Sequence, residues 1–257
     1  MKRKIVLWIL RIVLTAALVF ATVNIMKIFY DYHTAQNFYD TIRESFAVTL
    51  PTDSPSEKQD GVEPDAPSCP IEVDFDALRE INPDVVGWIY SPGTEICYPV
   101  VQAENNDKYL RHDLYGNYLV SGTVFVDYRC ASPEECKNYV IYGHNMDDGS
   151  MFASLLGYKK QSYYDEHPVL YYLTPEKNYE IELFVGGVVD MDSVIYESDP
   201  EPDELEELLT LLSSVGTFKS DVTASAGDSL VTLSTCMHSY ESSKERFIVV
   251  GRLVEIK

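Results

Sequence analysis

A cysteine and an arginine stand ten residues apart at the junction of two apolar runs. The stretch LVTLSTCMHSYESSKERFIVVGRL covers residues 230–253, and the two residues are Cys236 and Arg246. A thiolate is a strong nucleophile, and an adjacent guanidinium favours thiolate over thiol and donates hydrogen bonds to a carbonyl or an oxyanion. Spacing alone is equally compatible with a structural thiol and a solvated cation at a strand edge.

Both apolar runs have the composition of β-strands, in which successive side chains point to opposite faces. In the first run, Val231 and Leu233 share an apolar face that suits a barrel interior, whereas Cys236 lies on the more polar face with Ser234. If the two runs pair antiparallel, Cys236 and Arg246 flank the mouth of the nine-residue loop between them. We therefore expect Cys236 to line a groove at the end of its strand.

A nucleophilic thiolate also needs a group that handles protons. Among five histidines, His144 directly follows the apolar run Tyr139–Tyr142, and Gly143 lets the chain turn sharply toward a groove. His238, two residues beyond Cys236, is a rival base. A lone histidine is more often structural than catalytic, so this position suggests a role without deciding it.

The elements that must position these residues are mainly β. Eight short runs of β-branched and aromatic residues alternate with turn signals, which favours a barrel or sandwich over a parallel βαβ sheet. The predicted strands are Val85–Tyr90, Ile96–Val101, Gly122–Val126, Tyr139–Tyr142, Val169–Leu173, Tyr179–Val189, Ser229–Thr235 and Arg246–Ile256. The exception is DPEPDELEELLTLLSSV, residues 199–215, which predicts an amphipathic helix with Leu205, Leu208, Leu209 and Leu212 on one face, packed over one side of the barrel.

The first thirty residues predict a membrane anchor. Ile5–Met26 is apolar apart from Arg11 and Asn24, and its 22 residues are enough to cross the ~30 Å hydrocarbon core as a helix. The basic cluster precedes the span, so the N-terminus is expected in the cytoplasm and the remainder outside. A cleaved signal peptide is the alternative; no small-x-small cleavage site follows the run, and the run is long for a signal.

Between the anchor and the strands the composition changes twice. Residues 31–48 predict a helix leaving the membrane, residues 51–70 a proline-rich acidic linker, and the segment from Asp74 a short helix capped by Asp74 or Asp76. This gives three parts: an anchor over 1–30, a juxtamembrane helix and linker over 31–72, and a catalytic domain over 73–257.

Charge excludes one class of partner. The net charge is −21, and everything after residue 30 carries 15 basic against 41 acidic side chains, a net of −26. A body this acidic repels phosphate, so we expect no nucleic-acid partner.

Several segments together resemble the sortase family, and within it class B. YVIYGHNM (139–146) is similar to the sortase histidine motif, TLSTC (232–236) to the cysteine motif, and RFIVVGRL (246–253) to the arginine strand. Segments 74–102, 105–117 and 121–129 continue the similarity, which covers about residues 73–257. The three motifs in this order form a specific signal that outweighs the structural alternatives for the three residues.

The resemblance implies a mainly β fold, a closed eight-stranded sortase-type barrel with an N-terminal helix and a helix in residues 190–228, where class B enzymes build one wall of the substrate groove. It implies a cysteine transpeptidase anchored outside a Gram-positive membrane. Such enzymes cut secreted proteins at a C-terminal sorting signal containing Pro and Thr, after the threonine. They hold the acyl group as a thioester and pass it to an amine of the peptidoglycan precursor. No cofactor or metal is implied.

The same resemblance assigns roles by position. Cys236 becomes the nucleophile, His144 the general acid and then base, and Arg246 the group that steadies the substrate carbonyl or oxyanion. Ser234, Asn106 and Leu110 are expected to line the substrate groove. The chain departs from the pattern at His238, where some class B members have an acid.

The remaining cysteines leave alternatives open. Five cysteines outside the membrane are consistent with one free catalytic thiol and up to two disulfides. Cys130 and Cys136 flank the short loop CASPEEC, which is not a family feature, and Cys69 and Cys97 would pair only by elimination; free buried thiols are equally compatible. Three rival functions remain at this stage: a membrane-tethered cysteine hydrolase, a pilin-polymerising sortase and a non-catalytic surface module.

Overall fold

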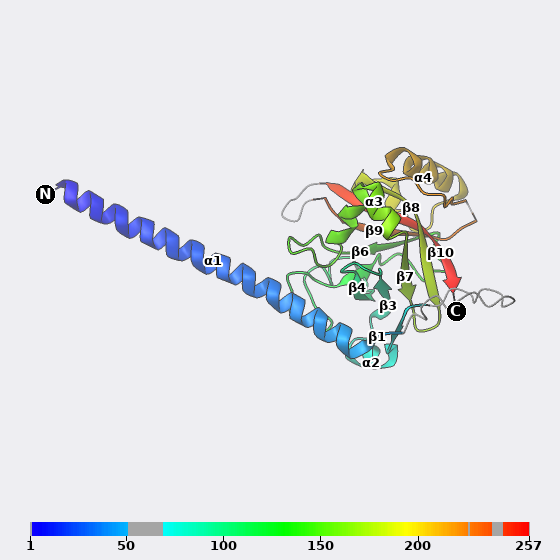
Figure 1. The fold of residues 1–257 in the computed structure, drawn as a ribbon, viewed down its shortest axis with the longest axis horizontal. Helices are drawn as coiled ribbons and strands as arrows, with labels where there is room; N and C mark the ends of the chain where they lie inside the picture. The colour runs from blue at the N-terminus through cyan, green and yellow to red at the C-terminus, as the bar shows by residue number, and fades with distance from the viewer. Residues whose placement is uncertain (1, 51–68, 226, 238–243, 257) are drawn as a thin grey trace, which may run out of the picture.

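The computed structural model describes residues 2–50, 69–225, 227–237 and 244–256. Eight strands close into a barrel in the order β10-β8-β7-β3-β4-β5-β6-β9 (Figure 1). The barrel strands are β3 (Val85–Tyr90), β4 (Cys97–Val101), β5 (Val124–Val126), β6 (Asn138–Tyr142), β7 (Val169–Leu173), β8 (Asn178–Asp190), β9 (Leu230–Cys236) and β10 (Glu245–Ile256). The predicted mainly β fold and closed barrel are confirmed, and each predicted strand corresponds to one of these.

The barrel interior is filled by the apolar faces of the strands. Val231 and Leu233 of β9 lie in one buried cluster with Tyr139 and Ile141 of β6 and Phe247 of β10. These residues alternate along their strands with side chains that point outward, as the period of two requires. The predicted direction of the Val231–Leu233 face is therefore confirmed.

Two of the barrel pairs are parallel, and one of them carries the candidate site. β4 pairs with β5, and β6 pairs with β9 in the register Asn138↔Leu230 to Tyr142↔Ser234. The other barrel pairs are antiparallel. A parallel pair needs a long crossover, and here the segment between β6 and β9 carries β7, β8 and the helix over the barrel.

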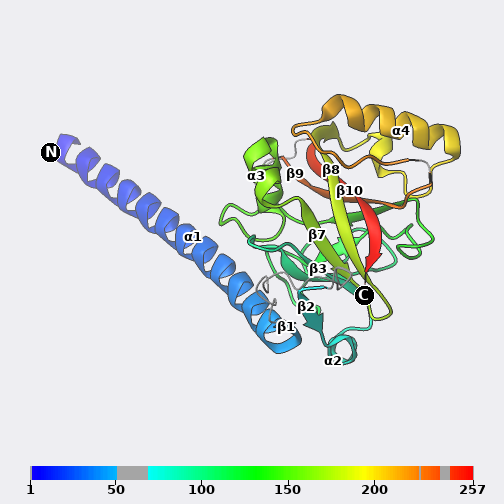
Figure 2. The ribbon, with the colours of Figure 1, turned by 45° about the vertical axis from the view of Figure 1, so that its right-hand side comes forward.

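Helix α4 (Pro202–Val215) covers the outer face of β8 and lies on the opposite side of the barrel from helix α2 (Phe75–Ile81) (Figures 1 and 2). Leu205, Leu208 and Leu212 are buried in a cluster with Leu230 of β9 and Val185 of β8. The predicted amphipathic helix is confirmed. It explains why β9 is buried on both faces, since α4 covers the face that points away from the barrel interior.

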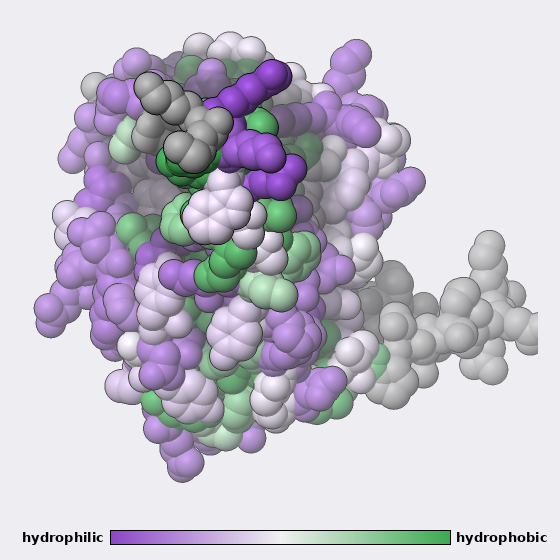
Figure 3. Space-filling view, turned by 90° about the vertical axis from the view of Figure 1, so that its left-hand side faces the viewer, coloured by the Kyte–Doolittle hydropathy of each residue, from purple (hydrophilic) through white to green (hydrophobic). Residues whose placement is uncertain are grey.

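The N-terminal segment forms a single helix, α1 (Lys2–Phe46), which includes the predicted membrane span and most of the predicted juxtamembrane helix. By length and composition it is apolar enough to cross a membrane, and its first thirty residues project away from the barrel (Figure 1). Ala35, Tyr39 and Ile42 are buried against the barrel end. Seen from the side to which α1 projects, apolar residues form a central column among mostly hydrophilic side chains (Figure 3).

The short helix α2 (Phe75–Ile81) begins where the sequence predicts. The Ala77 amide donates a hydrogen bond to the Asp74 carboxylate at 3.0 Å, so Asp74, rather than Asp76, is the N-cap. Before it, β1 (Ala47–Thr49) and β2 (Ile71–Val73) pair as a two-stranded sheet. The predicted linker lies largely in residues 51–68, outside the described residues.

Three helical elements were not predicted. The 3-10 helices η1 (Ala153–Lys159) and η2 (Val194–Tyr196) and the helix α3 (Gln161–Glu166) are each one or two turns long. The expectation of no regular helix between the strands, apart from the one at 199–215, was therefore wrong for the β6–β7 connection. Elements this short show too few turns for a helical period to be visible in the sequence.

Candidate active site

Cys236 and Arg246 are direct cross-strand partners. The antiparallel pairing of β9 and β10 places Cys236 opposite Arg246, followed inward by Thr235↔Phe247 and Ser234↔Ile248. Side chains of directly opposed residues lie on the same face of a sheet. Both residues are half-buried, and the predicted position of the pair at the mouth of the β9–β10 connection is confirmed.

The turn that carries His144 is fastened to the same end of β9. The parallel register of β6 and β9 ends at Tyr142↔Ser234, and the chain then continues alongside β9. The Gly143 amide donates to the Ser234 carbonyl at 3.1 Å, and the Asn145 side-chain amide donates to the Cys236 carbonyl at 3.1 Å. His144 lies between these two anchor points, so the main chain itself carries it to the level of Cys236.

Gly143 is required by a close approach of another side chain. A Cβ at this position would lie 2.6 Å from the Phe152 ring, which is fully buried beneath the turn. The Thr235 hydroxyl donates to the Gly143 carbonyl at 2.8 Å and fixes the turn from the other side. The glycine predicted to let the chain turn thus also lets the turn pack against the core.

His144 is held by the main chain of another loop. Its Nε2 is 2.8 Å from the Leu110 carbonyl oxygen, which only accepts, so Nε2 carries the proton and Nδ1 is the basic nitrogen when the ring is neutral. Burial lowers the pKa of His144; the bond to Leu110 raises it, Arg111 lowers it further, and the net pKa is below the usual value. The imidazole is therefore neutral at neutral pH.

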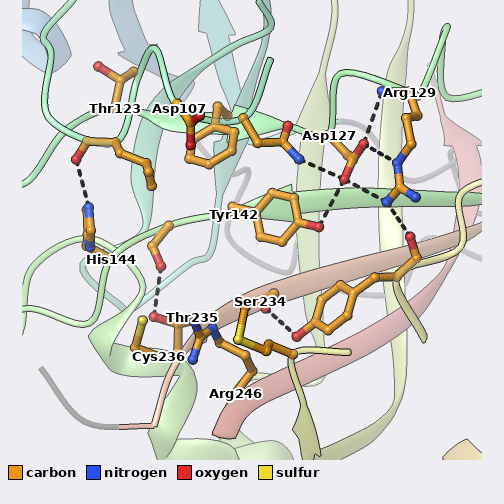
Figure 4. Close-up of a pocket in the computed structure, with 16 residues that line it drawn as sticks. Asp107, Thr123, Asp127, Arg129, Tyr142, His144, Ser234, Thr235, Cys236 and Arg246 are labelled. Carbon is orange, nitrogen blue, oxygen red and sulfur yellow. Dashed lines mark hydrogen bonds and ion pairs between the residues drawn. The ribbon is translucent and has the colours of Figure 1, made fainter. Parts of the chain in front are cut away.

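These residues line one cavity of about 390 Å³ (Figure 4). In that view Cys236 lies between His144 and Arg246. Among the described residues, the lining comprises Asn106, Asp107, Leu110, Thr123, Phe125, Asp127, Arg129, Tyr142, Gly143, His144, Met191, Tyr196, Ser234, Thr235, Cys236 and Arg246. All six residues expected from the sequence at the site, the three of the motifs and Ser234, Asn106 and Leu110, are brought together here.

The sequence did not reveal an ion pair at one side of this cavity, between a buried aspartate and a partly exposed arginine. Asp127 is fully buried and receives two hydrogen bonds from the Arg129 guanidinium, at 2.9 and 3.0 Å, one from the Arg129 amide at 3.0 Å and one from the Tyr142 hydroxyl at 3.0 Å. Asn106 donates a further one at 3.0 Å. Burial raises the pKa of Asp127, but these donors outweigh it, so the pKa is lowered and the group is a carboxylate.

A second tyrosine connects this ion pair to the cysteine strand. Arg129 donates to the Tyr196 carbonyl at 2.6 Å, and the Tyr196 hydroxyl shares a hydrogen bond of 2.9 Å with the Ser234 hydroxyl. Tyr196 and Met191 come from the segment 190–228 and line the cavity, whereas α4 of the same segment packs on the barrel. The only sequence signal for this network was an aspartate and an arginine two residues apart after a predicted strand.

Two further points concern the rival base and possible metal ligands. His238, the rival base, falls among residues 238–243, outside the described residues. Within the part of the chain that the structure describes, no group of three or more His, Cys, Asp or Glu side chains is arranged to hold a metal ion.

Comparison with known proteins agrees with the fold. A family model described as "Sortase domain" matches residues 89–254. Sortase B of Listeria monocytogenes is 37% identical over 178 residues, which are 69% of this chain and 72% of that protein. Sortase B of Staphylococcus aureus is 27% identical over 257 residues, the whole of both chains.

Solved structures give the same result. Sortase B from B. anthracis, solved in complex with AAEK1, superposes with a TM-score of 0.71 at 30% identity and covers 88% of this chain and 99% of its own. The 2.0 Å crystal structure of S. aureus sortase B has a TM-score of 0.67 at 30% identity and covers 71% and 87%.

The closed barrel and its family match define the protein class as a cysteine transpeptidase, an enzyme that exchanges one amide bond for another through a thiol. The chain belongs to the sortase family, and its relatives are class B members. Sortases act on sorting signals at cell surfaces.

Proposed function

We propose that Cys236, His144 and Arg246 are the catalytic residues of this class B sortase. The observation that carries the proposal is the convergence of three elements at one cavity: β9 ending at Cys236, its cross-strand partner Arg246, and the His144 turn bonded to both Ser234 and Cys236. Each is held by hydrogen bonds to the main chain, so their relative positions follow from the backbone of the barrel.

The first half of the reaction forms a thioester. The thiol proton of Cys236 passes to Nδ1 of neutral His144, and the sulfur attacks the carbonyl carbon of the threonine in the sorting signal. The guanidinium of Arg246 stabilises the negative charge that develops on the carbonyl oxygen. The C–N bond then breaks, and imidazolium gives its proton to the leaving amine.

The second half reverses these steps with a different amine. The amine of the acceptor attacks the thioester carbon and loses a proton to His144, the C–S bond breaks, and Cys236 recovers its proton. The acceptor is the amine of a peptidoglycan precursor; a solved complex of S. aureus sortase B with triglycine supports an amine-terminated peptide as its chemical class.

The substrate lies in the cavity beside these residues. Leu110 offers a partly exposed apolar side chain, and Ser234 and Asn106 offer polar groups that already belong to the wall. A solved complex of S. aureus sortase B with its substrate supports substrate binding by this fold. The Pro/Thr-containing signal is the substrate class we propose.

The apolar helix α1 supports the location that we propose. We assign residues 1–30 as a membrane anchor with a cytoplasmic N-terminus, residues 31–72 as the juxtamembrane part and residues 73–257 as the extracellular catalytic domain. The exposed apolar surface of α1 up to Tyr30 supports the anchor. Labelling single added cysteines at each end of α1 in intact cells with an impermeant maleimide tests the orientation, and labelling only at the N-terminal end would reverse it.

The test uses the full chain in detergent with peptides of the Asn-Pro-x-Thr type, with and without triglycine. Cleavage with ligation to triglycine is the expected result, whereas cleavage unchanged by triglycine indicates a hydrolase. Cys236→Ala is expected to abolish cleavage, with Cys97→Ser, another half-buried thiol, as the matched control. Retained cleavage by Cys236→Ala would overturn the proposal, and a larger loss for His238→Ala than for His144→Ala would reassign the base.

A further inference from the structure

The connection between β5 and β6 contains two thiols, Cys130 and Cys136. The transpeptidase reaction uses neither of them. Cys130 and Cys136 are 2% and 4% exposed, whereas Ala131, Glu134 and Glu135 between them are exposed. The connection therefore turns both sulfurs inward and most of the residues between them outward.

The fold brings the two thiols close together. Both belong to one buried cluster, and the Cys136 sulfur accepts a hydrogen bond from the Ala131 amide, the residue directly after Cys130, at 3.2 Å. The Cys136 amide donates to the Ser132 carbonyl at 3.0 Å, and the Cys130 thiol faces the Asn138 carbonyl at 3.7 Å. Hydrogen bonds thus already close the loop and place the Cys136 sulfur beside the main chain that carries Cys130.

The surroundings also shift the pKa values of the two thiols in opposite directions. The neighbouring Cys130 thiol and the Ala131 amide together lower the pKa of the Cys136 thiol. The neighbouring Cys136 thiol, with burial, raises the pKa of Cys130. Thiol–disulfide exchange begins with a thiolate, so Cys136 is the attacking sulfur of the pair.

We propose that Cys130 and Cys136 form an intramolecular disulfide that closes the β5–β6 connection. The oxidant is a small-molecule or protein disulfide. The Cys136 thiolate attacks one of its sulfurs and releases the first thiol; Cys130 then loses its proton, attacks the Cys136 sulfur and releases the second. Two electrons and two protons pass to the oxidant, and one S–S bond replaces another.

The link would hold one wall of the cavity. Arg129 directly precedes Cys130, and its guanidinium bonds both to Asp127 and to the Tyr196 carbonyl. Closing the loop behind Arg129 restrains the backbone from which this side chain reaches the cavity. The oxidising setting rests on the proposed surface location, because extracellular proteins keep disulfides, but the bond itself is tested without any assay of catalysis.

The chain offers a direct test. Trypsin cuts after Arg129 and Lys137, so both cysteines fall on one peptide, CASPEECK. The full-length Cys236→Ala protein, which lacks the proposed nucleophile, is equilibrated with glutathione disulfide, acid-quenched, denatured, treated with iodoacetamide and digested. The expected peptide is unalkylated and two hydrogen atoms lighter than the reduced form. A doubly alkylated CASPEECK, as in a dithiothreitol-treated control, would overturn the proposal.

Thermal unfolding gives a second readout. In the same Cys236→Ala background, dithiothreitol should lower the midpoint of the oxidised protein by about 5 °C, as for a loop of this size. Cys130→Ser/Cys136→Ser should lose this dependence, while Cys97→Ser should keep it. A parent midpoint indifferent to dithiothreitol contradicts a stabilising disulfide.

Discussion

Arg246 faces Cys236 directly across the β9–β10 pair, so a guanidinium and a thiol occupy neighbouring positions on one sheet face. The ladder continues without a shift through Ser234↔Ile248 to Arg252↔Leu230. A register of this length cannot slip by one residue without turning the buried faces of both strands outward. The relation of the two side chains is therefore set by the barrel core.

Replacing Arg246 should separate charge from geometry. Arg246→Ala is expected to lower kcat/KM by about 10² to 10³, the usual cost of losing an oxyanion donor, and Arg246→Lys by less, because it keeps the charge without the planar donors. Peptide-cleavage kinetics measure both. Arg252→Ala, on the same strand and paired with Glu182, is the matched control; an Arg246→Ala loss no greater than this control would remove Arg246 from the mechanism.

On the acid side, the activity should decline at a lower pH than expected for a base with the usual histidine pKa. The pKa of His144 is lowered, mainly by burial, so the neutral base persists below pH ~6.5 and kcat/KM should fall only at lower pH. Arg111 contributes to the lowering, so Arg111→Ala should move this decline to higher pH. An unmoved decline would mean that another group controls it.

The same shift has a consequence for stability. In the unfolded chain His144 titrates near pH ~6.5, whereas in the folded protein it takes up its proton at lower pH. The unfolded state therefore binds more protons in this window, and this part of the stability is present above pH ~6.5 and is lost as the pH falls toward the folded pKa. Urea unfolding at pH 7 and 5 should show a smaller loss for His144→Asn than for the wild type.

Removing the charge of Asp127 should weaken substrate binding more than it slows the chemical steps of the reaction. Asp127→Asn keeps the shape but removes the closer of the two carboxylates that pair with Arg129 among the described residues, leaving only Glu197 at 4.0 Å, and gives the Tyr142 hydroxyl a weaker acceptor. We expect KM to rise about tenfold, kcat to change little, and stability to fall by about 1–3 kcal/mol, since Arg129 is partly exposed. Asp107→Asn, exposed on the same cavity, controls for charge; equal effects of the two variants would contradict a positioning role.

A methyl group at Gly143 should lower the catalytic rate more than it lowers the stability of the fold. The added Cβ would lie 2.6 Å from the buried Phe152 ring, so the turn must shift and carry His144 with it. We expect Gly143→Ala to lower kcat by at least about tenfold, with a loss of about 1–3 kcal/mol in unfolding free energy. Gly216→Ala, whose Cβ meets nothing closer than 3.7 Å, should leave both near the wild-type values.

Prediction from the sequence succeeded where a local period or a long motif carried the information. Alternation along residues 230–236 correctly placed Val231 and Leu233 in the barrel interior, and the nine-residue gap correctly brought Cys236 and Arg246 together. The helix α4 was visible because its leucines recur along one face. In each case neighbouring residues contain the physical cause of the structure.

What escaped prediction depends on contacts between distant segments. Asp127 and Arg129 form a network with Tyr142 and Tyr196 only because β6, η2 and the end of β5 meet at the cavity. The Leu110 carbonyl acts on His144 through a backbone atom, which no side-chain pattern encodes. The helices η1 and α3 are too short to show a period, and the role of His238 stays a prediction.

The parallel pairing of β6 with β9 also has a kinetic meaning. Asn145 and Cys236, which it brings together, are 91 residues apart, and the intervening chain contains β7 and β8. Contacts of such long sequence separation form late, because loop closure must precede any gain from them. The thiol thus acquires its histidine only as the barrel closes, and partly folded chains carry no assembled nucleophile that could react prematurely.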